Sequence, residues 1–254
     1  MAELPPSPEG IVLAHFIVSD DVERSRRFYT EVLGGRVAFS GPGGLTYVAL
    51  SNSWIIINTG GGPTDDKPAV TLEAPRDPDR VSSFLNIRVR DIEAVPTTEV
   101  MMNNIDEDLV LAHFIVSNDV ERSRRFYTEV LGGRVVFSGP GGLTYVALSN
   151  SWIIINVGGG PTDDKPAITL ETPRDPDRVS SFLNIRVKDI KAVYAEWSAR
   201  GAHFLTPPKQ HQYEIRCYIR DPDGHIIEVG QTTDFEGDWH PAHWPSSTPA
   251  GESG

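Results

Sequence analysis

The polar residues of this chain form none of the common catalytic motifs. Its Gly-Pro-Gly-Gly and Gly-Gly-Gly runs lack the Lys-Ser/Thr that a phosphate-binding loop requires. No serine lies in the GxSxG sequence of a nucleophile elbow. Cys217 is the single cysteine, so there is no intrachain disulfide or cysteine-based zinc cluster, and we interpret it as a small strand residue. These observations disfavour phosphate-loop and serine-hydrolase chemistry.

The side chains suited to a binding site lie in predicted strands. Arg216 and Tyr218 share one strand face, which lines either a pocket or a solvated surface. His211 precedes that strand in a loop, where a functional role is the less favoured interpretation. Tyr145 and Trp152, with Tyr218, supply the aromatic surface that an apolar small-molecule pocket needs.

Composition limits the classes of partner. A net charge of −12 argues against nucleic acid, because phosphate binding needs clustered Lys and Arg. No apolar run approaches the roughly 18 residues of a membrane span. The first ten residues lack the basic and apolar segments of a secretory signal. We therefore expect a cytoplasmic protein without nucleic-acid or membrane partners.

A long internal repeat dominates the sequence. Residues 12–95 recur as residues 110–193 at an offset of 98. The differences are Asp20/Asn118, Ala38/Val136, Thr59/Val157, Val70/Ile168, Ala74/Thr172, Arg90/Lys188 and Glu93/Lys191. Shared fold physics does not require such identity, because a core accepts many apolar sequences. The repeat indicates a recent duplication or a joining of copies.

Each copy begins with a predicted β-α-β-β-β module. In the first copy, residues 11–18 form a strand, and a helix follows with Asp20 as N-cap and Glu23 as its capping-box partner. Gly34-Gly35 ends that helix, and turns separate strands at 36–40, 45–50 and 53–58. A second module starts at residue 84, but Pro96 interrupts its helix.

Only the second copy continues into a whole second module, over residues 182–231. We therefore predict a truncated repeat at 11–95, a linker at 96–108, a complete domain at 109–232 and a flexible tail at 233–254. The two copies compete for residues 182–231. The directly connected copy has the higher effective concentration, so we expect 111–231 to be the working domain and 11–95 to dimerise or be swapped.

Paired β-α-β-β-β modules, the helix end RRFYTEVLGG and the hairpin DPDGHIIEV resemble the vicinal oxygen chelate superfamily. That family includes glyoxalases, extradiol dioxygenases and bleomycin-resistance proteins. The resemblance implies an α+β fold in which paired modules form a half-open, barrel-like sheet around a divalent metal. It also implies a homo-oligomer.

Carried over residue by residue, the family's metal positions fall on His113, Glu228 and Asn184. The implied metal is Mn, Mg, Ni, Fe or Zn. An amide in place of a second histidine departs from the usual pattern and suits a hard ion better than zinc. Arg186 shares a strand face with Asn184, where it holds an anionic substrate group or forms a salt bridge at the barrel mouth.

Two functions stay open at this point. One is a metal-dependent enzyme of lyase, isomerase or dioxygenase type that acts on a small oxygenated molecule. Asn184 departs from the ligand triad of a dioxygenase, and no catalytic base is assigned. The other is a metal-free protein that binds and sequesters a small molecule of antibiotic type.

Overall fold

The computed structural model describes residues 10–89 and 109–233, so the predicted linker and the tail after Thr233 lie outside it. The first copy contains β1 (Ile11–Val18), α1 (Val22–Arg27), the π-helical turn η1 (Phe28–Val32), β2 (Arg36–Ser40), the 3-10 turn η2 (Pro42–Gly44), β3 (Thr46–Leu50), β4 (Ser53–Asn58), β5 (Thr71–Leu72), β6 (Arg80–Val81) and β7 (Ser83–Val89). The second copy repeats this order as β8 (Leu109–Ser117), α3 (Val120–Arg125), η3 (Phe126–Val130), β9 (Arg134–Ser138), η4 (Pro140–Gly142), β10 (Thr144–Leu148), β11 (Ser151–Val157), β12 (Thr169–Leu170), β13 (Arg178–Val179) and β14 (Ser181–Val187). It continues into α4 (Ile190–Ala199), β15 (His203–Phe204), β16 (Lys209–Gln210), β17 (Glu214–Arg220) and β18 (Ile226–Thr232).

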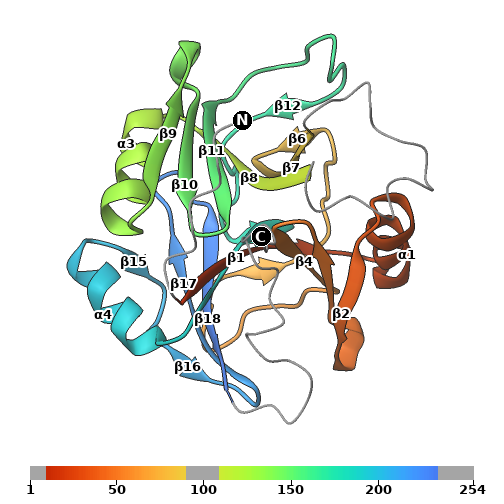
Figure 1. Cartoon of the computed structure of the whole chain (residues 1–254), viewed down its shortest axis with the longest axis vertical. Helices are drawn as coiled ribbons and strands as arrows, with labels where there is room; N and C mark the ends of the chain where they lie inside the picture. The colour runs from red at the N-terminus through yellow and green to blue at the C-terminus, as the bar shows by residue number, and fades with distance from the viewer. Residues whose placement is uncertain (1–9, 90–108, 234–254) are drawn as a thin grey trace, which may run out of the picture.

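The strands form two main sheets, and each sheet contains strands from both copies (Figure 1). The larger sheet has the order β15-β17-β18-β14-β1-β4-β3-β2, with β16 added to β17. The smaller sheet has the order β7-β8-β11-β10-β9. We call residues 11–58 with 181–232 the complete half. We call residues 83–89 with 109–157 the truncated half. It contains the strands of the smaller sheet that the structure describes.

This pairing corrects the predicted domain division. At the centre of the larger sheet, β14 lies antiparallel to β1 of the other copy, with Ile11 opposite Val187. In the smaller sheet, β7 lies antiparallel to β8 in the equivalent register. The first copy, and not the directly connected second copy, therefore pairs with residues 181–232.

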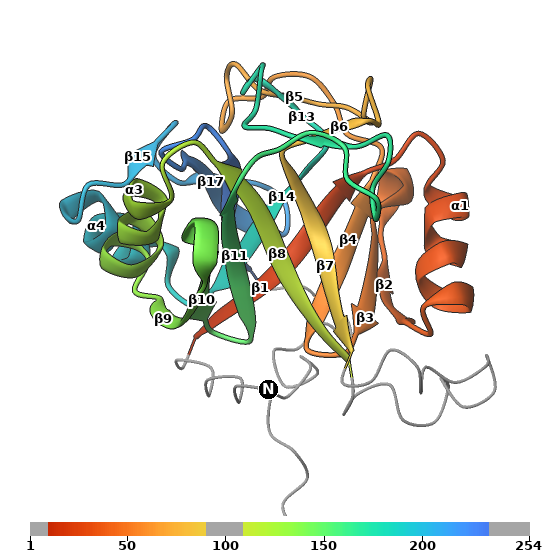
Figure 2. The ribbon, with the colours of Figure 1, turned by 90° about the horizontal axis from the view of Figure 1, so that it is seen from above.

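The connections that follow β4 and β11 cross over one another, above both sheets in Figure 2. At the crossing, β5 pairs with β13 and β6 pairs with β12. Arg80 binds Glu171, and the equivalent Arg178 binds Glu73. These contacts between the copies favour the exchanged pairing, and chain connectivity alone does not predict them.

Asp21, and not the predicted Asp20, caps the first helix. Its side chain accepts a hydrogen bond from the backbone N–H of Arg24. Asp20 instead forms an exposed ion pair with the Arg24 side chain, and Glu23 pairs with Arg26. Two adjacent aspartates left the start of the helix ambiguous by one residue, and the expected capping box does not form.

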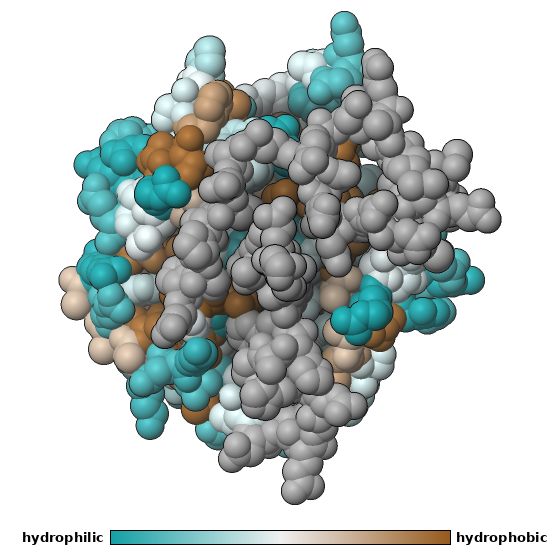
Figure 3. All heavy atoms as spheres, viewed as in Figure 1, coloured by the Kyte–Doolittle hydropathy of each residue, from teal (hydrophilic) through white to brown (hydrophobic). Residues whose placement is uncertain are grey.

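Each sheet has one face covered by helices and one face free of them. In β1, Leu13 packs into a helix-covered core with Ile190 and Trp197 of α4. Ala14 and Phe16, on the opposite face, belong to a separate apolar cluster without helices. Hydrophilic residues (teal) cover much of the visible rim, and apolar surface (brown) appears in smaller patches (Figure 3). No helix within residues 10–89 and 109–233 is long and apolar enough to cross a membrane.

Equivalent residues of the two copies make reciprocal contacts between the sheets. The Asn52 side chain bonds to the backbone N–H and C=O of Leu111, and Asn150 does the same for Leu13. Nδ1 of His15 lies 2.8 Å from Nδ1 of His113. Reciprocal contacts of this kind define an approximate twofold axis between the copies.

Candidate functional site

Three buried polar side chains meet on the helix-free face of the complete half. Register places Glu228 opposite Asn184 on one neighbouring strand and opposite Tyr218 on the other. The Asn184 amide donates to Glu228 Oε1 and the Tyr218 hydroxyl donates to Oε2, each at 2.7 Å. All three residues are at most 5% exposed. Both carboxylate oxygens of Glu228 thus have a donor from the protein itself.

Arg186 lies in the adjacent row and is fixed by an ion pair. Its Nη1 donates to Glu214 Oε2 and its Nη2 to Thr232 Oγ1, each at 2.8 Å. Nη1 also lies 3.8 Å from Glu228 Oε1. The guanidinium crosses Gly230, where a Cβ atom would come within 2.3 Å of Nη1. A side chain at 230 would therefore displace the arginine.

A second polar group comes from the loop after β4. Arg216 donates through Nε to Asp66 and through Nη1 to Glu214 Oε1, the latter at 2.8 Å. His211 Nε2 lies 3.0 Å from Asp66 Oδ2. Asp65, Asp66 and His211 place one ligand atom each within 4.8 Å of one another. The Arg216 guanidinium binds the same Asp66 oxygen, so its positive charge opposes a cation at this position.

Burial and charge set the protonation of the cluster. Burial raises the pKa of Glu228, and the nearby charge of Glu214 raises it further. Although burial opposes ionisation of Glu214, Arg186 and Arg216 hold its pKa below the ordinary value. Burial and the charge of Glu228 raise the pKa of Tyr218 well above its usual range. Of the two glutamates, Glu214 therefore loses its proton more readily than Glu228. Tyr218 stays protonated and acts as a neutral hydrogen-bond donor.

Aromatic side chains surround the polar row. Phe16 and Phe182 stack with ring centroids 4.4 Å apart, and Phe182 meets Tyr218 edge-on at 6.3 Å. Tyr47 lies edge-on to Trp54 at 6.2 Å. A cavity of about 400 Å³ opens beside Tyr47, and its lining also includes Phe39, Leu45, Arg186, Tyr213 and Glu214. Apolar walls with a few fixed polar groups are typical of small-molecule sites.

The predicted ligand His113 does not join Glu228, which corrects the expected metal set. His113 is 4% exposed and bonds to His15 in the contact between the two sheets. Its neighbours along the strand, Leu111 and Ile115, pack in the helix-covered cores. Because side chains alternate along a strand, His113 shares their face. The prediction assumed both the wrong pairing of modules and the wrong face of the strand.

The positions that would complete a metal site in the complete half hold no ligand side chains. Ala14 lies opposite Asn184 on β1, and β4 presents Trp54 and Ile56 on the helix-free face. Asn184 and Glu228 are bonded to each other. One carboxylate and one amide provide too few donors for a divalent ion held by protein ligands. These residues do not fit the metal that the resemblance implied.

Tyr145 and Trp152 also lie away from the predicted site. They sit in the truncated half, in the apolar cluster that contains Phe114. Their equivalents in the first copy, Tyr47 and Trp54, take the predicted place in the complete half. Because the copies match at these positions, the sequence alone does not tell which copy places its tyrosine and tryptophan in the same half as Arg186.

Asp66 and Glu214 were not selected from the sequence, although both carry the charges that fix Arg216. Glu214 begins the strand that contains Arg216 and Tyr218, and its position two residues before Arg216 puts both on one strand face. That spacing was an available signal. Asp66 lies in a loop 150 residues away from Arg216, and no local pattern connects them.

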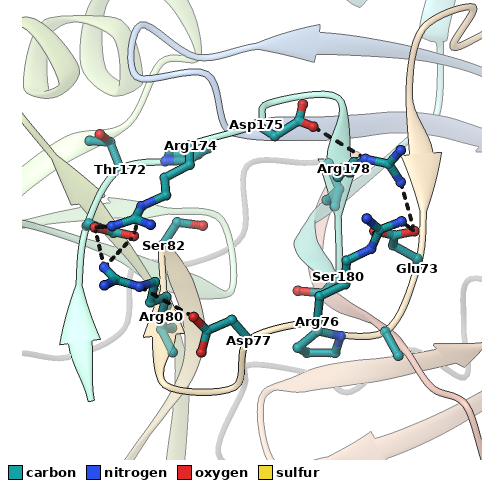
Figure 4. Close-up of a pocket in the computed structure, with 16 residues that line it drawn as sticks. Glu73, Arg76, Asp77, Arg80, Ser82, Thr172, Arg174, Asp175, Arg178 and Ser180 are labelled. Atoms are coloured by element: carbon teal, nitrogen blue, oxygen red, sulfur yellow. Dashed lines mark hydrogen bonds and ion pairs between the residues drawn. The ribbon is translucent and has the colours of Figure 1, made fainter. Parts of the chain in front are cut away.

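A hollow of about 370 Å³ lies between the crossing connections (Figure 4). Equivalent residues of both copies line it. Arg80 lies 3.1 Å from Glu171 and Arg178 lies 3.1 Å from Glu73, so each of these arginines has an acidic partner from the other copy. The close-up shows Arg80 and Arg178 on opposite sides of the hollow. The hollow is thus part of the contact that joins the copies.

Comparison with known proteins identifies the family. Residues 12–95 and 110–229 match the model of the Glyoxalase/Bleomycin resistance protein/Dioxygenase superfamily. The two matches span more than half of the chain, and the chain belongs to this superfamily. Its fold is the mixed α+β fold of paired modules that the sequence predicted, here with one set of modules duplicated.

Solved structures of similar fold include TnmS3, an antibiotic binding protein from Streptomyces sp. CB03234, with 21% identity over 47% of this chain and 92% of that chain and a TM-score of 0.36. A glyoxalase/bleomycin resistance protein/dioxygenase from Nocardioides has 20% identity over 50% of this chain and 85% of that chain, with a TM-score of 0.40. A glyoxalase-related enzyme from Fulvimarina pelagi has 22% identity over 47% and 84%, with a TM-score of 0.38. No curated protein matches the chain.

Proposed function

We propose that the complete half binds a small molecule with an aromatic, largely apolar body, and that it does so without a metal ion. The observation that carries this proposal is that Ala14, Trp54 and Ile56, which offer no metal ligand, share the helix-free face with Asn184 and Glu228, near a cavity with aromatic walls. An apolar body would pack against these walls, because burial of apolar surface drives such binding.

The polar groups of the cavity would orient the ligand and select its polar edge. Arg186 and Glu214 line the cavity as a fixed ion pair, and Tyr47 lines the same cavity. A ligand group that donates to Glu214 or accepts from the guanidinium would gain a charge-assisted hydrogen bond. The Glu228 carboxylate has its own donors, which supports a structural role for it over that of a general base.

The test is a fluorescence titration of the full chain with 8-anilinonaphthalene-1-sulfonate, followed by displacement with a panel of polycyclic aromatic compounds. We expect saturable displacement that EDTA and added Mn²⁺ leave unchanged. Tyr47→Ala should weaken displacement about tenfold, since it removes one aromatic wall. Tyr145→Ala is the matched control in the other copy and should change it less than about twofold.

Two results would contradict the proposal. One is a divalent ion that co-purifies at one per chain and is required for ligand binding. The other is a larger effect of Tyr145→Ala than of Tyr47→Ala, which would move the site to the truncated half. Circular dichroism of each variant confirms that it is folded before its affinity is interpreted.

A further inference from the structure

The strands β7 and β14 have the same sequence, Ser-Phe-Leu-Asn-Ile-Arg-Val, but different surroundings. β14 lies between β1 and β18, whereas β7 has a described strand, β8, on one edge only. Ile185 is fully buried, and its equivalent Ile87 is 37% exposed. Arg186 is 2% exposed, and its equivalent Arg88 is exposed. Because the sequences are identical, the difference shows what β7 lacks.

β14 has two kinds of contact without a counterpart at β7 among the described residues: backbone pairing with a second neighbouring strand, and hydrogen bonds to carboxylates. Along β14, the parallel strand β18 places Ile227, Glu228 and Val229 opposite Leu183, Asn184 and Ile185. Asn184 donates to Glu228 and Arg186 donates to Glu214. Among the described residues, Asn86 and Arg88 have no carboxylate partner. Arg88 turns instead to the Tyr145 hydroxyl, with its guanidinium 5.3 Å from the centre of that ring.

We propose that the edge of β7 opposite β8, which pairs with no strand among residues 10–89 and 109–233, accepts a strand from a partner protein, parallel to β7, with the pattern apolar-Glu-apolar. The partner's glutamate lies opposite Asn86 and within reach of Arg88, and its apolar residues face the side of Leu85 and Ile87. An exposed strand edge is a ready template for such addition, because its backbone donors and acceptors fix the added strand. The carboxylate gives the pairing its charge-assisted hydrogen bonds.

The sequence of β7 itself argues against a second copy of this chain as the occupant. Residues 83–89 contain no aspartate or glutamate, so two β7 strands joined edge to edge would place Arg88 without a carboxylate from the partner. The acidic strand of the complete half is also committed, because β18 lies between β14 and β17. A strand with a glutamate from another protein would pair with the backbone of β7 and would supply the carboxylate for Arg88.

The test uses the full chain and a fluorescently labelled synthetic peptide with the sequence of residues 221–232, which contains the Ile-Ile-Glu-Val strand. We expect saturable binding by anisotropy and slowed amide hydrogen exchange at residues 84–88, with unchanged exchange at 182–186. Replacing the peptide's glutamate with glutamine should weaken binding about tenfold. Arg88→Glu in the chain should weaken binding at least as much, because it repels the peptide.

Arg134→Glu is the matched control, because this exposed arginine begins β9 at the opposite edge of the same sheet. It should leave peptide affinity unchanged. The proposal is overturned by a lack of saturable binding, by protection at 182–186 in place of 84–88, or by full affinity in Arg88→Glu. Sedimentation gives a further check. A dimer of the unmodified chain that Ile87→Lys dissociates would assign the edge to a second copy and also overturn the proposal.

Discussion

The two halves of this molecule contain nearly the same first module, yet its residues have different environments in each. On the helix-free faces, the complete half buries Asn184 and Arg186 against acidic partners, while Asn86 and Arg88 of the truncated half have none among the described residues. Burial and charge pairing of a strand therefore depend on the module that lies beside it, and not on its own sequence.

The helix-covered faces show the opposite asymmetry. Tyr127 of the second copy is fully buried, and its hydroxyl donates to Asp221 Oδ2 at 3.0 Å. Phe126 is 8% exposed, whereas its equivalent Phe28 is 48% exposed. The module at 181–232 thus pairs its strands with the first copy and packs its helix and its 221–224 turn against the second. One module therefore contacts both copies, and it adds to the other contacts that join them.

The largest difference between the halves should appear when equivalent arginines are replaced. Arg186→Met leaves the half-buried carboxylate of Glu214 with one cation fewer, and we expect the free energy of unfolding to fall by about 3–5 kcal/mol. Arg88→Met removes an exposed side chain and should cost less than about 1 kcal/mol. Urea denaturation measures both. Equal losses would show that the halves do not differ in the way described.

The two histidines at the contact between the halves, His15 and His113, should make the free energy of unfolding depend strongly on pH. Burial lowers the pKa of His15 to about 4, and burial, with the charges of His15 and His225, lowers that of His113 well below its usual value. Below about pH 6.5, the unfolded chain therefore binds protons at these histidines that the folded state does not bind. Stability should be full above that pH and fall as the pH drops towards 4, by about 3 kcal/mol for His15.

Urea denaturation between pH 4 and pH 8 tests this dependence. His15→Asn and His113→Asn should each reduce the slope, and by similar amounts, because the two side chains share one contact. A wild-type stability that stays constant from pH 6.5 to pH 4.5 would contradict the prediction. So would a variant pair in which only one substitution alters the slope.

The smallest effect concerns residues for which the halves should be equal. Asn52→Ala removes both hydrogen bonds to the backbone of Leu111, and Asn150→Ala removes those to Leu13. Each leaves a buried N–H without its partner, which costs about 1–3 kcal/mol. We expect the two losses, measured by urea denaturation, to agree within about 0.5 kcal/mol. A clear inequality would show that the reciprocal contacts do not carry equal weight.

The modules were predictable from the sequence, because alternation of apolar residues, turn glycines and helix ends act within a few residues. The convergence of Asn184, Arg186, Arg216, Tyr218 and Glu228 was also predictable, since all lie in one module with simple register. The pairing of modules was not. Two copies that match in sequence offer the same contacts to residues 181–232, and local patterns cannot distinguish them.

The failure at His113 follows from that limit. Its residue type and its place on a first strand both fit a ligand position, but alternation alone does not tell which face of a buried strand meets the helices when both faces are apolar. Leu111 and Phe114 are equally hydrophobic in sequence terms, yet they pack in different cores. The missing information was which face of the smaller sheet, to which β8 belongs, packs against the helices.

The exchanged pairing also has a consequence for synthesis on the ribosome. β1 leaves the ribosome early, and its final partner β14 follows only after the whole second copy, since Ile11 lies opposite Val187. β7 carries the same seven residues as β14 and emerges long before it. The nascent first copy therefore offers β1 a matching strand before β14 is made, and any pairing of β1 with β7 has to be exchanged before β14 and β8 can take their places. Pairing between such distant segments is slow, so the rate of folding of this chain should depend on that exchange.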